Sequence, residues 1–180
     1  MSVESKPIRE AIIKARKNDV IILASASNEG LNTPITFPAN IGHPNVFCIG
    51  AADATGTRSN FSPPSKGFEK FSAVGEAVMG ATFDKYVIPS FVTTRRDGTS
   101  TATPVAAGIA SLLITYTRQF LDPGSDAANY DNMRKVFLSM SQHASGESYR
   151  FLAPWSLFEN MITSERQEKF RTILDSPPSK

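Results

Sequence analysis

A chain of 180 residues is long enough to bury the core of one ordinary globular domain. Its net charge of +2 comes from interspersed basic and acidic residues, which argues against nucleic acid or an anionic membrane as a partner. A single cysteine excludes an internal disulfide, and one cysteine with two distant histidines argues against a Cys/His zinc site. No apolar run reaches about 18 residues and the start lacks a signal-peptide core, so the compartment stays unassigned.

The first part of the chain predicts one helix and two buried strands. Residues 5–18 predict a helix, because Ser5 can cap it and Pro7 suits its first turn. Its apolar face would consist of Ile8, Ala11, Ile12 and Ala15. Two continuous apolar runs follow at 20–26 and 45–52, and such runs are typical of parallel strands buried on both faces. Cys48 lies inside the second run and is predicted to be a buried, small hydrophobic side chain.

The middle of the chain predicts a loop, further strands and a long helix. Turn-forming residues dominate 53–70, which is predicted to be a surface excursion. A third strand is predicted near 76–82, and 86–94 is expected to pair as a hairpin leading to the next motif. Residues 100–121 have a helical pattern and predict the longest buried helix of the chain.

The last part predicts two more helices and a tail. Residues 130–140 predict a helix with one apolar face, formed by Met133, Val136, Phe137 and Met140. Ser164 and Gln167 predict a capping box for a short helix that carries Phe170, Ile173 and Leu174. This helix, with the aromatic run 151–158, is expected to dock on its own domain or on a partner. Residues 176–180 predict a disordered tail.

Two polar residues next to apolar segments predict catalytic chemistry. The run 98–108 places the Ser100 hydroxyl where an Ala/Gly-rich helix begins, and Gly98 permits a close approach to it. Asn28 follows the strand predicted at 20–26, and its amide is suited to donate to a developing oxyanion. Taken singly, Ser100 fits a helix cap equally well, and an Asn before Glu-Gly is more commonly a turn residue.

These two segments resemble motifs of the subtilisin-like serine protease family, peptidase S8. That family places its serine in a Gly-Thr-Ser-x-Ala-[Ser/Thr]-Pro-x-x-[Ala/Ser]-Gly run, and 98–108 fits every fixed position. The family's oxyanion Asn follows a Gly, whereas Ser27 stands before Asn28 here. Short segments between the two motifs keep the family's order, namely 37–39, 45–51, 59–62 and 73–75, so the similarity spans roughly residues 1–155.

The resemblance implies a fold and an organisation. The fold would be α/β, a parallel sheet flanked by helices, incomplete at its N-terminal side. Residues 1–160 would form the C-terminal part of a subtilisin-like peptidase domain, followed at 161–180 by a C-terminal helix and the tail.

The resemblance also implies site residues. Ser100 would attack a peptide carbonyl, and the Asn28 amide and the Ser100 N–H would hold the oxyanion. An extended peptide or protein substrate would lie beside Ser25, Ala26 and Ser27, with Thr36 at the floor of the specificity pocket. No cofactor is expected, and no metal ligand is assigned. Calcium is common in the family, but no Asp/Asn-rich loop places it in this sequence.

The family's catalytic Asp and His precede the Asn strand along the chain, and this sequence has no such segment. The main hypothesis is therefore half of a serine endopeptidase that is inactive without its N-terminal half. An alternative is a non-catalytic pseudoprotease that binds peptide or protein by strand addition at the edge of 20–26. A third is an independent esterase with His143 as the base and Asp126 or Asp131 orienting it. His43 lies in a turn and fits none of these roles.

Overall fold

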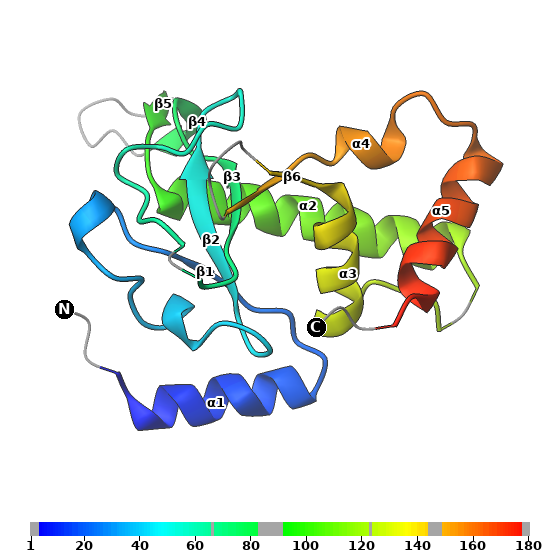
Figure 1. Cartoon of the computed structure of the whole chain (residues 1–180), viewed down its shortest axis with the longest axis horizontal. Coiled ribbons are helices and arrows are strands. Elements are labelled where there is room, and N and C mark those ends of the chain that lie inside the picture. Colours follow the sequence, from blue (N-terminus) through cyan, green and yellow to red (C-terminus); the bar gives the residue numbers. More distant parts are fainter. Residues whose placement is uncertain (1–3, 66, 83–91, 123, 144–148, 178–180) are drawn as a thin grey trace.

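A five-stranded sheet forms the centre of the molecule (Figure 1). The computed structural model describes residues 4–65, 67–82, 92–122, 124–143 and 149–177. In spatial order the strands are β1 (Leu23–Ser25), β2 (Phe47–Ala52), β3 (Phe71–Val74), β7 (Arg150–Leu152) and β6 (Ser141–His143). The first four run parallel and β6 pairs antiparallel to β7, so the predicted parallel sheet is confirmed.

Helices cover both faces of this sheet. On one face lies α1 (Lys6–Lys17), whose Ile12 packs with buried residues of β1 and β2. On the other face lie α2 (Thr99–Phe120) and α3 (Tyr130–Met140). Two shorter helices, α4 (Trp155–Phe158) and α5 (Thr163–Asp175), pack beside α3. At the opposite end of the molecule, β4 (Val78–Thr82) and β5 (Val92–Arg96) form a separate antiparallel hairpin (Figure 1).

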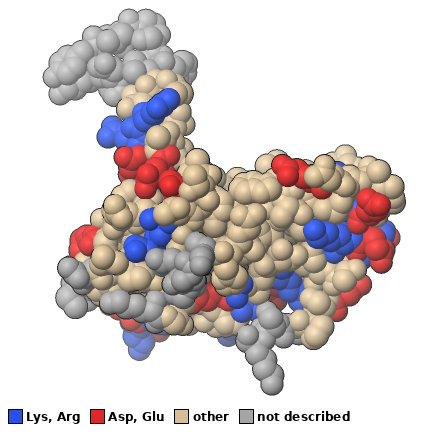
Figure 2. Space-filling view, turned by 45° about the horizontal axis from the view of Figure 1, so that its top comes forward, with Lys and Arg blue, Asp and Glu red and all other residues tan. Residues whose placement is uncertain are grey.

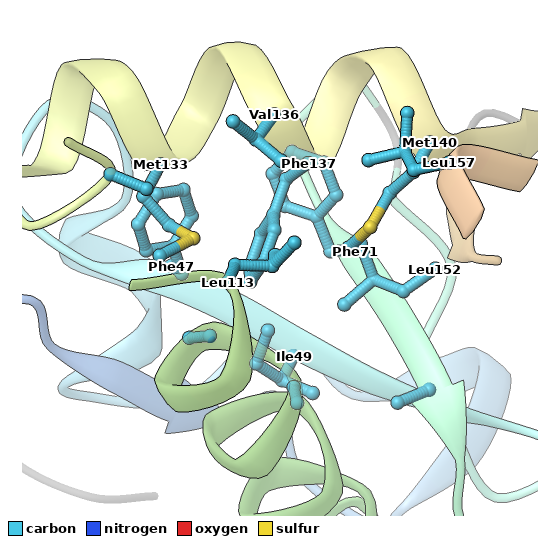
Figure 3. Packing of buried hydrophobic residues seen from close by; sticks show 14 of the residues in the cluster. Phe47, Ile49, Phe71, Leu113, Met133, Val136, Phe137, Met140, Leu152 and Leu157 are labelled. Carbon is cyan, nitrogen blue, oxygen red and sulfur yellow. The ribbon is translucent and has the colours of Figure 1, made fainter. Parts of the chain in front are cut away.

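Strand β2 is buried along its whole length, as its continuous apolar run predicts. Phe47 and Ile49 face α2 and α3, whereas Cys48 points to the α1 side and is buried. The Phe47 ring stacks on Tyr130 with centroids 4.2 Å apart, and Figure 3 shows Met133, Phe137 and Met140 of α3 reaching toward the sheet. The core therefore lies mainly between the sheet and the helices α2 and α3.

The first helix and strand differ from expectation in detail. Helix 5–18 is confirmed as α1, but Ser5 makes no side-chain cap bond and Ile8 is 50% exposed. The strand predicted at 20–26 is shortened to β1. The reason is that the Val20 N–H donates to the Ala15 carbonyl at 3.1 Å, so this residue belongs to the turn that ends α1.

The strand predicted near 76–82 is confirmed as β4, but the third strand of the main sheet is β3, which the sequence did not predict. Gly75 ends the ladder, with its N–H on the Ala52 carbonyl at 2.9 Å, and Ala77 turns the chain with a φ of 54°. The following residues form β4, which leaves the sheet and pairs with β5. Of the predicted hairpin segment 86–94, only Val92 to Thr94 lie within the described residues.

The segment 53–70 is more buried than the predicted surface excursion. It has turns, but Ser59, Ser62, Ser65 and Lys70 are buried. The Ser62 hydroxyl accepts the Ala51 N–H at 3.1 Å, and the Lys70 ammonium donates to the Pro63 carbonyl. The Ser62 bond ties the segment to β2, and the Lys70 bond links two parts of the segment to each other.

Helix α2 is the longest of the described helices, as predicted, but only one of its faces is buried. Ala102, Ala106 and Leu113 face the sheet, whereas Leu112 is 71% exposed. The Ala/Gly-rich composition does not distinguish these faces, since both are apolar. None of the described helices has the length and apolarity needed to cross a membrane.

The predicted helices near the C-terminus are confirmed with one shift. α3 buries Met133, Val136, Phe137 and Met140 as predicted. α5 starts before Ser164, because the Glu165 carboxylate accepts the Ile162 N–H at 3.2 Å and takes the place of the predicted Ser164–Gln167 box. Phe170 and Leu174 join the main core, so this helix docks on the body. Most of the predicted tail, 178–180, lies outside the described residues.

Two adjacent leucines of α2 provide a test of this packing. We expect Leu113→Ala to lower the free energy of unfolding by about 3 kcal/mol, because it leaves a cavity in the core. We expect Leu112→Ala to change it by less than about 0.5 kcal/mol, because that side chain is mostly in solvent. Urea denaturation of both variants measures the difference, and equal effects would contradict the orientation of α2.

Candidate active site

The predicted site residues meet at the carboxyl ends of β1 and β3. The loop after β1 carries Ser27 and Asn28, Gly75 follows β3, and α2 begins between them at Thr99. Open α/β sheets bind ligands at this edge, because loops and helix N-termini converge there. The architecture therefore brings together segments that are far apart in the sequence.

Asn28 is fixed by the first turn of α2. Its Oδ1 accepts the Thr99 N–H at 2.8 Å and lies 2.9 Å from the Thr99 hydroxyl. Since a carboxamide has one oxygen and one NH₂ group, this contact directs Nδ2 away from Thr99. The same bond supplies an acceptor for one of the α2 N–H groups that has none inside the helix.

Asn28 Nδ2 and Ser100 Oγ converge over Gly98. A Cβ atom on Gly98 would lie 3.0 Å from Ser100 Oγ and 3.2 Å from Asn28 Nδ2. Gly98 has a φ of 152°, which L side chains rarely adopt. The predicted nucleophile and the predicted oxyanion donor therefore share one small space, which only a glycine leaves open.

Ser100 lies in the first turn of α2 and is exposed. The first N–H groups of a helix lack intrahelical acceptors, and the helix dipole places partial positive charge there. The Ser100 hydroxyl thus lies next to backbone and side-chain donors. This arrangement can stabilise negative charge on an oxygen that is bonded to a carbon attacked by Ser100.

A close contact between strand and helix holds Ser100 in place. The Gly98 N–H donates to the Gly75 carbonyl at 2.8 Å. A Cβ on Gly75 would lie 2.6 Å from the Ala51 Cβ and 3.0 Å from the Ala102 Cβ. The end of β3 therefore touches the start of α2 without an intervening side chain.

The remaining predicted substrate residues lie beside this centre. Ala26 is buried, its N–H donates to Ile49 at 2.9 Å, and its carbonyl accepts the Thr36 N–H at 3.2 Å. Ser25 ends β1. Ser27 has a φ of 117°, so the residue that replaces the family's Gly keeps a conformation suited to Gly.

The structure places His143 at the wrong edge of the sheet for the esterase hypothesis. His143 lies in β6 opposite Arg150, at the start of β7, whereas Ser100 lies at the carboxyl ends of the parallel strands. Its Nε2 is 2.7 Å from Arg150. Asp126 and Asp131 instead contact Arg118 and Arg16, at 3.1 and 2.7 Å. These contacts do not assemble a base for Ser100.

The structure also shows the surroundings of the other histidine and of the single cysteine. His43 lies with its ring centroid 5.7 Å from that of Tyr130. Within the described ranges, no group of three or more His, Cys, Asp or Glu side chains is placed to hold a metal ion. Burial raises the pKa of the Cys48 thiol to about 12, which favours the unreactive, protonated form.

The model of the Subtilase family matches residues 1–146. The chain belongs to the subtilase family. It is 31% identical over 114 residues to subtilisin DY of Bacillus licheniformis, covering 62% of this chain and 38% of that protein. It is 29% identical over 110 residues to the minor extracellular protease Epr of Bacillus subtilis (strain 168), covering 61% of this chain and 16% of Epr.

A solved subtilase structure shares the fold. The protease domain of PatA, in its S218A mutant, superposes with a TM-score of 0.64 at 27% identity, over 79% of this chain and 48% of that chain. The sequence therefore spans about half of this structural neighbour and less than half of the two Bacillus subtilases.

Sequence reasoning gave no role to Thr99 or Gly75. Thr99 is buried, and its hydroxyl lies 3.1 Å from the Ser27 carbonyl and 2.9 Å from Asn28 Oδ1. Its place beside Ser100 in the motif was the available signal. Gly75 lies in the segment 73–75 that keeps the family's order, but the sequence does not show its contacts with Gly98 and Ala102.

We expect Thr99→Val to lower the free energy of unfolding by about 1 kcal/mol, because it removes the hydroxyl between Ser27 and Asn28. The matched control is Thr103→Val. The Thr103 hydroxyl only bonds the Thr99 carbonyl within the helix, at 2.7 Å, so its loss should cost less than about 0.5 kcal/mol. Urea denaturation measures both changes. An equal cost at the two positions would contradict a special role for Thr99.

We expect Ser27→Gly to raise the free energy of unfolding by about 0.5 kcal/mol, because it relieves the strain of a φ of 117°. The same substitution at Ser25 should lower it by about 0.5 to 1 kcal/mol, since Ser25 lies in a strand and Gly adds backbone entropy to the unfolded chain. Thermal or urea unfolding compares the two variants. Destabilisation by Ser27→Gly would show that this backbone is not strained.

Proposed function

We propose that this chain supplies the nucleophile and the oxyanion donors of a serine endopeptidase. The observation that carries the proposal is the convergence of Ser100 Oγ and Asn28 Nδ2 over Gly98. Family membership supports it, since both residues lie in motifs that resemble those of the subtilases. Ser100 and Asn28 are thus assigned as the catalytic residues of this chain.

In the proposed reaction, Ser100 Oγ attacks the carbonyl carbon of a peptide bond and its proton moves to a base. The Asn28 amide and the Ser100 N–H hold the resulting oxyanion. The intermediate then expels the amine, which takes the proton from the base, and water hydrolyses the acyl-serine. A serine hydroxyl is a poor nucleophile without a base. We assign the base and its orienting carboxylate to the N-terminal half of a complete subtilase domain.

Two surfaces of the chain support such a complement. β1 is the first strand of the sheet, so its outer edge has no partner strand among the described residues. The outer face of α2 exposes Leu112, and α1 exposes Ile8. Parallel sheets are normally covered on both faces and their edges protected, so a segment that adds a strand beside β1 suits these surfaces.

The substrate we propose is an extended peptide or protein segment. Ser25, Ala26 and Ser27 present small side chains along the end of β1, which leaves room for a peptide next to Ser100. The Thr36 N–H bonds the Ala26 carbonyl at 3.2 Å, so Thr36 lies where it can form the floor of a specificity pocket. A threonine floor suits medium or large apolar side chains.

The free edge of β1 also favours a second candidate function. A non-catalytic chain would use the unpaired backbone groups of this edge to bind an extended peptide by strand addition. The two candidates differ in covalent chemistry. A peptidase forms an acyl bond at Ser100, whereas a binding protein holds the peptide without reacting.

The test combines this chain with a separate N-terminal half of a subtilase that carries the family's Asp and His. We expect no peptidase activity above background from the chain alone. With the complement present, we expect both cleavage of a fluorogenic peptide and labelling by a fluorophosphonate. Ser100→Ala should abolish both, and Ser111→Ala, an exposed serine of the same helix, should leave both unchanged.

Three results would redirect the proposal. Strong cleavage by the chain alone that is lost in Ser100→Ala would show that no complement is needed. Peptide binding without labelling, in a complex that forms stably, would favour the non-catalytic function. Labelling that persists in Ser100→Ala would assign the nucleophile to another residue.

A further inference from the structure

A groove of about 430 Å³ starts at Ser100 and runs between α2 and the β4–β5 hairpin. Its α2 wall includes Ser100, Thr101 and Pro104, and its hairpin wall includes Val78, Thr94 and Arg96. Figure 2 shows the hairpin as a projection from the body, with basic side chains along it and acidic side chains at its base. The groove is therefore an open channel that begins at the proposed nucleophile.

Strand alternation directs Arg96 into this groove. Thr94 and Arg96 are two residues apart in β5, so they lie on the same face of the hairpin, and both line the groove. Arg96 pairs across the hairpin with Val78, which also lines it. Arg95 lies on the opposite face of β5 and is absent from the lining, although consecutive residues of β4, including its partner Met79, also line the groove. The chain thus offers two adjacent arginines, of which one faces the groove.

The Arg96 guanidinium has no ion pair or hydrogen bond with any residue in the described part of the chain. The acidic residues next to the hairpin are Glu76 and Asp97, and the Asp97 carboxylate accepts the Ala77 N–H at 2.6 Å. The rest of the groove wall is largely apolar, with Val78 and Pro104. A guanidinium in such a wall matches a carboxylate, with which it can form two parallel hydrogen bonds.

The groove lies on the opposite side of Ser100 from the proposed peptide segment at β1. The Thr99 side chain contacts Ser27 and Asn28 after β1, whereas the Thr101 hydroxyl is 3.2 Å from the Gly75 carbonyl after β3. Because β1 and β3 flank β2 on opposite sides, Ser100 lies between these two regions. A peptide that lies along Ser25 to Ser27 and passes Ser100 would continue into the groove.

We propose that this groove receives the part of the substrate on the C-terminal side of the scissile bond, and that Arg96 selects a carboxylate there. The inference rests on the proposed function and names a substrate class for it. The carboxylate belongs either to an Asp or Glu side chain or to the C-terminus of a short substrate. Both present the same chemistry to Arg96, so the experiment must separate them.

The test measures peptide binding to ¹⁵N-labelled Ser100→Ala chain, so that no turnover occurs. Three peptides begin with the same sequence, Ala-Ala-Phe-Ala, and differ only in their C-terminal parts. One continues with Asp-Ala and has an amidated end, one ends in a free carboxylate without an acidic side chain, and one is neutral and amidated. Titration to millimolar peptide monitors the amide signals of Thr101 and Val105 at the groove.

We expect at least one of the two carboxylate peptides to bind about threefold to fivefold more tightly than the neutral peptide, as befits an exposed ion pair. Tighter binding of the Asp peptide would identify a side-chain carboxylate as the ligand, and tighter binding of the peptide with a free end would identify the C-terminal carboxylate. Arg96→Glu should remove this preference and favour a peptide with Lys in place of Asp. Arg95→Glu, the matched control on the other face, should retain the original preference. High salt should reduce the preference, since it screens exposed charges.

Several results would overturn the inference. Arg96 would have no role in selecting a carboxylate if all three peptides bound equally well. The same conclusion would follow if the preference survived Arg96→Glu, or if Arg95→Glu changed it as much as Arg96→Glu. If the amide signals of Thr101 and Val105 did not change, the peptide would not bind in the groove. None of these results affects fluorophosphonate labelling of Ser100 in the complemented protein, so the proposed function is judged separately.

Discussion

The hydrogen bond from the Thr99 N–H to Asn28 Oδ1, 2.8 Å long, links the loop after β1 to the first turn of α2. It satisfies a helix N–H that has no partner within the helix, and it fixes which end of the Asn28 side chain faces Ser100. The orientation of the Asn28 amide toward Ser100 therefore depends on a contact between segments 71 residues apart. If this bond were lost, Nδ2 would no longer be held beside Ser100 Oγ, even though the sheet and the helix would remain.

The sequence pattern was sufficient to predict elements whose apolar residues recur at a regular spacing. Residues 130–140 form the predicted helix with the predicted buried face, because apolar residues at helical spacing form one continuous face that packs against the core. The motif at 98–108 predicted a helix that begins at Ser100, and α2 begins one residue earlier, at Thr99. The role of Thr99 was not predictable, since its partners Ser27 and Asn28 lie in another segment and no periodicity relates them.

The errors have physical causes that are specific to each segment. β3 is a strand of four residues between Lys70 and Gly75, and its signal is weaker than that of the more extended run that became β4. In α2 the composition is apolar around the helix, so the sequence does not say that Leu113 is buried and Leu112 exposed. The orientation of Arg96 toward the groove required the register of the hairpin, which fixes the face of each residue in β5.

Gly75 and Gly98 form the contact between β3 and α2, and neither has a side chain that could take part in chemistry. Any larger residue at Gly75 would meet Ala51 and Ala102 at distances of 3.0 Å or less and would force the strand and the helix apart. The mutational tolerance of this protein is therefore unevenly distributed. Its least replaceable positions include Gly75, which has no side chain, whereas the side chain of the nearby Ser100 is exposed and is not part of the core.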